Sequence, residues 1–311
     1  MTTPTPTVPG SPALLLVGHG SRSAAGVAEY WRLAGVLEAA APHLAVGCGF
    51  IELAAPDLDT AIDGLVAAGA TSVVATPLIL LGAGHLKNDG PAALHRGRHR
   101  HPGVDFRYAR DLGIHPLVLA VAEDRIRAAV GDHEPSTVAV VVVGRGSSDP
   151  DANADLYKVA RLLWDSRGLE LVEPAFVSLA PPSVGAALDR CRRLGAQRVV
   201  VLPYLLFTGV LVERIRAEAA AWAAASPEVE VRAGPHLGAD PRIADLLLDR
   251  YREALGGEAR MNCDLCVYRT ALPGYEARVG TPLPAAAHGH AHPSPRPTAP
   301  TEGGDATGDH R

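Results

Sequence analysis

Three side chains that can bind metals or accept protons follow short apolar runs in the first half of the chain. His19 lies between two glycines after the run 13–17, Glu52 stands at the end of a second run, and His85 follows a third run and a glycine-rich loop. Imidazole is a base near neutral pH, and imidazole and carboxylate groups both bind divalent transition metals. Two histidines and a carboxylate at such positions predict a metal site with open coordination positions. Each residue alone could instead be a hydrogen-bonded loop residue or, for Glu52, a solvated one.

The same backbone pattern occurs a second time without this chemistry. A shift of 126 residues lays the segment 144–211 on the segment 18–85 without a gap. The glycines, prolines and valines are kept, but the equivalents of the three residues are Arg145, Ser178 and Leu211. A repeat this long indicates duplicated domains rather than a solenoid. We therefore expect one active half and one structural or substrate-binding half.

Both halves are predicted to alternate strands and helices. In the first half we expect strands at 13–17, 44–53, 72–81 and 104–109, and helices at 24–40, 57–68, from about 88, and 116–130. In the second half we expect strands at 137–143, 170–178, 198–207 and 229–233, and helices at 153–167, 183–194, 212–224 and 241–255.

This alternation predicts an α/β fold of two tandem doubly wound domains with parallel sheets and a ligand cleft between them. Ligands of such sheets lie outside the carboxyl ends of the strands. His19, Glu52 and His85 all fall at or just after such ends. Three separate elements are thus expected to bring them to one rim.

Composition divides the chain further. We expect a disordered N-terminal tail over 1–11, domains over 12–132 and 133–256, and a Cys-x-x-Cys segment over 257–279. The His- and Pro-rich tail over 280–311 has too little apolar content to fold and is expected to be disordered.

Charge and hydropathy exclude several classes of protein. The 311 residues carry a net charge of -5, which argues against general nucleic-acid binding, and 47% of them are hydrophobic, which predicts a sizeable core. The longest strongly apolar stretch, 199–211, is shorter than the ~20 residues needed to span a bilayer. No secretory signal precedes the first domain, so we expect a cytoplasmic protein without membrane partners. Four cysteines do not indicate a disulfide scaffold.

A dense basic run covers 95–101. It could be the solvated end of a helix. Alternatively, it could form a cationic rim that attracts a multiply carboxylated ligand, together with Arg22 and Arg145.

Three motifs together resemble the class II chelatases, in particular their long, duplicated sirohydrochlorin cobaltochelatases. They are Gly-His-Gly-Ser-Arg at 18–22, Phe-Ile-Glu-Leu-Ala at 50–54, and the apolar run with its Gly-Ala-Gly-His end at 77–85. The resemblance covers about 12–270 and implies insertion of Co²⁺ into sirohydrochlorin in cobalamin biosynthesis, by a monomer or homodimer. Fe²⁺ insertion for sirohaem, Ni²⁺ insertion, and a non-catalytic metal or tetrapyrrole carrier remain alternatives.

The resemblance also assigns roles to single residues. His19 would bind the metal and accept a pyrrole proton, with a pKa near the ordinary ~6.5, and His85 would be the second metal ligand. Glu52 would take a proton, orient a histidine or contact the tetrapyrrole. The loop expected to contact the ring comprises Leu80, Leu81, Gly82, Ala83 and Gly84.

Cys263 and Cys266 have two interpretations. The resemblance implies a [4Fe–4S] cluster, which usually needs four cysteine ligands. Cys48 and Cys191 fall in a predicted strand and helix, so the cluster would need a second subunit or other ligands. The alternative is an inert or occasionally disulfide-bonded pair.

Overall fold

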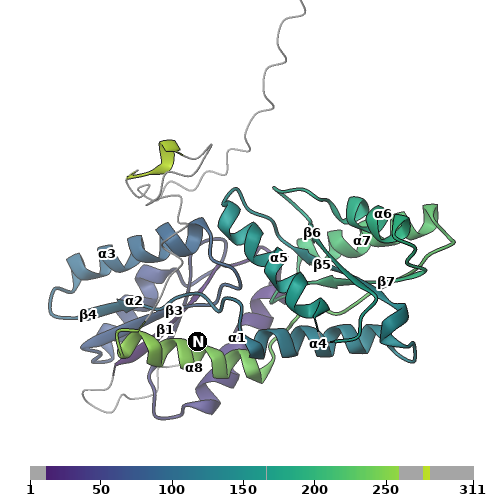
Figure 1. Ribbon diagram of the computed structural model, residues 1–311. Coiled ribbons are helices and arrows are strands. Elements are labelled where there is room, and N and C mark those ends of the chain that lie inside the picture. Colours follow the sequence, from purple (N-terminus) through teal and green to yellow (C-terminus); the bar gives the residue numbers. More distant parts are fainter. Residues whose placement is uncertain (1–11, 166, 259–275, 281–311) are drawn as a thin grey trace, which may run out of the picture.

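The computed structural model describes residues 12–165, 167–258 and 276–280, and it contains two parallel four-stranded sheets. The sheets have the orders β2-β1-β3-β4 and β6-β5-β7-β8, each with helices against it (Figure 1). The predicted α/β class with two tandem parallel sheets is confirmed.

The first half contains β1 (Ala13–Gly18), α1 (Ala24–Ala40), β2 (Val46–Phe50), α2 (Leu58–Ala67), β3 (Ser72–Pro77), the π-helix η1 (His85–Asp89), α3 (Gly90–Arg100), β4 (Asp105–Tyr108) and α4 (Pro116–Val130). The second contains the 3₁₀ helix η2 (Pro135–Thr137), β5 (Ala139–Gly144), α5 (Pro150–Trp164), β6 (Leu171–Phe176), α6 (Val184–Arg193), β7 (Arg198–Pro203), α7 (Val210–Ala225), β8 (Glu230–Ala233) and α8 (Pro241–Leu255). A short 3₁₀ helix, η3 (Glu276–Arg278), follows.

The duplication is visible in the register of the sheets. Leu14 pairs with Val46 in the first sheet, and Val140 pairs with Val172 in the second, which is the same pair shifted by 126 residues. Every residue of β1 and β5 is buried. Continuous apolar strands of this kind are typical of parallel sheets covered on both faces.

Two of the predicted strands continue well past the observed ends. The apolar runs 72–81 and 198–207 continue as strands only to Pro77 and Pro203. The last β1–β3 pair is Val17 with Pro77, and the chain then leaves the sheet. An apolar run alone cannot show where pairing ends. The residues after each proline are apolar because they line a cleft, as described below.

The last helix of each half packs on the sheet of the other half. Helix α8 lies against α1, β3 and β4, while α4 lies against β7, β8 and α5 (Figure 1). The two halves are therefore held together by packed helices as well as by the segment that connects them.

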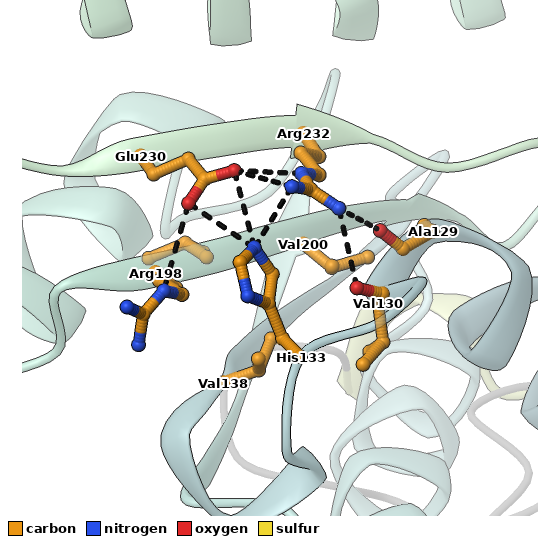
Figure 2. Close-up of a pocket in the computed structure, with 9 residues that line it drawn as sticks. Ala129, Val130, His133, Val138, Arg198, Val200, Glu230 and Arg232 are labelled. Carbon is orange, nitrogen blue, oxygen red and sulfur yellow. Dashed lines mark hydrogen bonds and ion pairs between the residues drawn. The ribbon is translucent and has the colours of Figure 1, made fainter.

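Polar contacts fix α4 to the second sheet. Arg232 on β8 donates hydrogen bonds to the carbonyl oxygens of Ala129 and Val130, at 3.4 Å and 3.2 Å, at the end of α4. The same guanidinium pairs with Glu230 at 2.7 Å, and His133 lies beside both around a small pocket (Figure 2). This pocket lies where β7 and β8 begin, and ligands of parallel sheets bind at the opposite edge. We infer that the side chains around this pocket have a structural role.

Within the described residues, no helix combines the length and the apolarity needed to cross a bilayer. The Cys-x-x-Cys pair, Cys263 and Cys266, lies outside the described residues, as do the expected N-terminal tail over 1–11 and all of the expected C-terminal tail after residue 280.

Candidate functional site

His19, Glu52 and His85 meet at the carboxyl edge of the first sheet. His19 follows β1, Glu52 follows β2, and His85 lies beyond the loop after β3. One ligand atom from each residue lies within 4.8 Å of the others, and no other such group of three occurs in the part of the chain that the structure describes. The His19 Nε2 atom is 3.1 Å from His85 Nε2 and 3.4 Å from Glu52 Oε1. The predicted convergence on one rim is thus present in the structure.

Gly20 allows the loop after β1 to contact the loop after β2. Gly20 has a φ of 94°, and a methyl group added to it would lie 1.7 Å from the carbonyl oxygen of Glu52. The Glu52 amide donates to the carbonyl of His19 at 3.1 Å. Only glycine fits this position, because the backbone is left-handed and another backbone fills the space. The loop contact thereby sets the Glu52 backbone directly beside that of His19.

His85 is held by a widened helical turn. In η1 the amide of Gly90 donates to the carbonyl of His85, five residues earlier, as in π-helical turns that often mark functional sites. Four residues after His85, the Asp89 carboxylate lies 2.6 Å from the Nδ1 atom of that histidine. Asp89 is 16% exposed and makes no capping bond to α3, so its carboxylate serves the histidine. Carboxylates in this position commonly orient metal-binding imidazoles.

These contacts assign the tautomers of both histidines. His85 Nδ1 donates to Asp89, and His19 Nδ1 lies 3.1 Å from the Gly20 carbonyl oxygen, which can only accept. Both Nε2 atoms then carry lone pairs, and these face each other across 3.1 Å. Two facing lone pairs repel unless a cation lies between them. At metal–nitrogen distances of about 2.1 Å, this spacing gives an angle of about 95° at the metal, which suits two adjacent ligands.

The site favours a neutral His19. Burial, then the neighbouring His85, and to a smaller extent Arg145, lower the pKa of His19 to about 4, although the Gly20 carbonyl and Glu52 act in the opposite direction. This pKa is well below the ordinary value expected from the sequence. His19 is therefore a ready metal ligand at neutral pH but does not retain a proton there.

A cleft opens between the two halves beside these histidines. Its wall is mostly apolar and includes the segments 78–81 and 204–206 that follow β3 and β7. Of the residues expected to contact a ligand, Leu80, Leu81, Ala83 and Arg145 line it together with His19 and His85. The other expected contact residues, Gly82, Gly84, Glu52 and Arg22, do not line it, and Arg22 is exposed.

A buried ion pair joins the halves next to His85. The Lys87 ammonium lies 2.8 Å from Asp149 and 3.2 Å from Asp151, and the three side chains are at most 10% exposed. Burial alone would lower the pKa of Lys87, but the two carboxylates more than offset this and raise it. The segment that carries His85 is thus fastened to the second half.

The basic run 95–101 does not reach the cleft. Arg96 pairs with Asp59, Arg100 pairs with Asp59 and Asp63, and His101 pairs with Asp63, all between α3 and α2. No residue of the run lines the cleft. Of the two interpretations, the structure favours the solvated helix end. The run does not form the alternative cationic rim, because its side chains pair with the carboxylates of α2.

Sequence reasoning missed four residues near the site: Asp89, Lys87, Asp149, which caps α5, and Asp151 in its first turn. The spacing of Asp89, one helical turn after His85, is a signal that could have found it. The pairing of Lys87 with Asp149 and Asp151 has no such signal, because it spans the two halves.

Comparison with known proteins covers most of the chain. The CbiX family model matches twice, over residues 13–129 and 139–254. A sirohydrochlorin cobaltochelatase of Priestia megaterium is 38% identical over 262 residues, 84% of this chain and 85% of that protein. A sirohydrochlorin ferrochelatase of Bacillus subtilis (strain 168) is 32% identical over 263 residues, 83% of this chain and 98% of that protein.

Solved structures agree with this placement. SirB from Bacillus subtilis with Fe³⁺ has a TM-score of 0.71 and 31% identity, covering 80% of this chain and 98% of its own. The sirohydrochlorin chelatase SirB from Bacillus subtilis subspecies spizizenii in complex with cobalt has a TM-score of 0.65 and the same 31% identity and coverage. With its two matched halves, its sheets and its relatives in agreement, the chain belongs to the CbiX family.

Proposed function

We propose that this chain inserts Co²⁺ into sirohydrochlorin in cobalamin biosynthesis. The observation that carries the proposal is the pair of facing Nε2 atoms of His19 and His85, 3.1 Å apart, at the wall of an apolar cleft. Relatives that match most of this chain insert metals into sirohydrochlorin according to their names. Cobalt is favoured because the cobaltochelatase of Priestia megaterium is 38% identical to this chain, whereas ferrochelatases of Bacillus subtilis (strain 168) and Priestia megaterium are 32% and 34% identical.

The reaction needs ligands that hold the metal ion and an apolar surface that binds the tetrapyrrole ring. Sirohydrochlorin must lose its pyrrole protons and take up a cation that exchanges its water ligands for ring nitrogens. His19 and His85 would hold the cation with open positions toward the cleft. The apolar segments 78–81 and 204–206 would contact the ring faces, while its peripheral carboxylates remain near solvent and Arg145.

The protons can leave through the same histidine. When the metal moves into the ring, the Nε2 lone pair of His19 becomes free and can accept a pyrrole proton. Its pKa of about 4 means that it releases this proton quickly to solvent at neutral pH. Glu52, whose side chain is 7% exposed and 3.4 Å from His19, would stabilise the transient imidazolium.

Turnover under anaerobic conditions tests the proposal. Catalytic amounts of the protein are mixed with sirohydrochlorin and Co²⁺, Fe²⁺ or Ni²⁺, and the tetrapyrrole absorption is followed. We expect multiple turnovers, fastest with Co²⁺ and lost in His19→Ala, while His43→Ala, which changes an exposed histidine, keeps the wild-type rate.

Other outcomes would change the proposal in defined ways. Fastest turnover with Fe²⁺ would make the chain a ferrochelatase that uses the same site. Tight metal binding without turnover above the spontaneous rate would make it a carrier. Unchanged rates in both His19→Ala and His85→Ala would refute the site.

A further inference from the structure

Two leucines have a left-handed backbone at equivalent places in the two halves. Leu53 has a φ of 64° and Leu179 a φ of 62°, and within the described residues they are the only non-glycine residues with positive φ. Bulky L-residues avoid this region because the side chain approaches the following carbonyl group. Both leucines are nevertheless exposed, at 43% and 64%.

Each leucine is the central residue of a γ-turn. The Ala54 amide donates to the Glu52 carbonyl at 2.8 Å, and the Ala180 amide donates to the Ser178 carbonyl at 2.7 Å. A γ-turn with a left-handed central residue is rare and strained. Glycine or asparagine would adopt it more easily. Neither leucine belongs to a buried core cluster, so core packing does not explain why leucine occupies these positions.

Both turns adjoin residues at the cleft, although the two leucines are not themselves among the residues that line it. The carbonyl oxygen of Glu52 would be 1.7 Å from a methyl group on Gly20, next to His19. The carbonyl oxygen of Ser178 would be 1.8 Å from a methyl group on Gly146, a residue that lines the cleft. Because the turns follow β2 and β6, they lie at the carboxyl edges of the two sheets, one on each side of the cleft.

The second half lacks the equivalents of His19, Glu52 and His85 but has kept this turn and its leucine. Ser178 stands in place of Glu52, yet Leu179 still follows it with nearly the same φ. A role in metal chemistry would not require the copy in the second half. A role in holding a large ligand from two sides would.

We propose that Leu53 and Leu179 are apolar contacts for the tetrapyrrole, one from each half, at the mouth of the cleft. This inference rests on the proposed function. The ring of sirohydrochlorin is flat and apolar between its peripheral carboxylates, so it offers a surface that isobutyl groups can cover. Strained backbone retained at an exposed position is typical of ligand-binding segments.

Asparagine variants separate this role from a structural one. Leu53→Asn and Leu179→Asn accept positive φ but remove the apolar surface. The matched control is Leu194→Asn, which changes a leucine that is 67% exposed at the end of α6, next to the amino edge of the second sheet. Dissociation constants for metal-free sirohydrochlorin are measured by absorbance titration, those for Co²⁺ alone separately, and Tm by circular dichroism.

Each cleft variant should bind sirohydrochlorin roughly fivefold to tenfold more weakly, the loss expected for about 50 Å² of apolar surface that the ligand no longer covers. Its Tm should not fall and its Co²⁺ affinity should not change, while Leu194→Asn should match the wild type. Sirohydrochlorin affinity within twofold of wild type in both cleft variants would overturn the inference, and so would a Tm several degrees lower. Failure of the wild-type protein to bind sirohydrochlorin would instead refute the proposed function, and this inference with it.

Discussion

Replacing Asp89 with asparagine should weaken metal binding without removing a metal ligand. The carboxylate accepts the Nδ1 proton of His85 at 2.6 Å, which leaves the Nε2 lone pair directed at His19. An asparagine can turn its amide NH₂ toward Nδ1, and the imidazole proton then moves to Nε2, where it blocks the metal. Asp89→Asn should therefore be more damaging than Asp89→Ala, which only frees the ring.

The size of the effect follows from the geometry. A hydrogen bond to a charged group contributes about 1.5–3 kcal/mol, and this one is short and only 16–23% exposed on its two sides. Loss of a carboxylate that orients a metal-binding histidine typically costs about 10–100-fold in affinity. The two estimates agree, since that range corresponds to about 1.4–2.7 kcal/mol.

Anaerobic titration with Co²⁺, followed by the visible absorption of the bound ion, measures the affinity. Asp63→Asn is the matched control, because Asp63 accepts from His101 at 2.7 Å in a similar pair that is exposed and remote from the cleft. A Co²⁺ dissociation constant within twofold of wild type in Asp89→Asn would refute the role of Asp89 in orienting His85 for metal binding. An equal loss in the control would do the same.

Three further predictions concern charges near the site. Lys87→Met leaves Asp149 and Asp151 buried without their cation, so it should cost about 3–5 kcal/mol of unfolding free energy, seen as a Tm lower by roughly ten degrees. A Tm that falls by less than one degree would show that this ion pair does not hold the two halves together. In NMR titrations the His19 ring should titrate near pH 4, and Arg145→Ala should raise that midpoint, because Arg145 lowers the pKa; a midpoint near 6.5 would contradict the assigned burial. As the pH falls, His19 is protonated in the unfolded chain before it is protonated in the folded one. The stability that depends on its lowered pKa should therefore be present above pH ~6.5 and lost as the pH falls to ~4. The denaturation midpoint of His19→Ala should depend less on pH over that interval, and an equal dependence would count against a lowered His19 pKa.

The duplication and the place of the site could be predicted from sequence because both depend on local backbone requirements. Gly20 and Gly146 are fixed by the left-handed backbone and by the carbonyl groups that press against them, so they mark both copies. Apolar runs predicted the strands, and the carboxyl ends of parallel strands share one edge, which brought His19 and His85 together.

What could not be predicted depends on contacts between distant segments. Lys87 meets Asp149 across 62 residues of sequence, and nothing in either segment specifies the partner. The exchange of α4 and α8 between the sheets likewise leaves no periodic signal. The ends of β3 and β7 were misplaced because residues that line a cleft are as apolar as those inside a sheet.

The proposed metal site is tested most directly by a crystal structure of the protein soaked in Co²⁺, with anomalous scattering at the cobalt edge. We expect a single strong peak about 2.1 Å from the Nε2 atoms of both His19 and His85, with Glu52 beside it and the remaining positions facing the cleft. A cobalt ion bound elsewhere with these two histidines still in contact, or an unchanged peak in the His19→Ala/His85→Ala double variant, would contradict it.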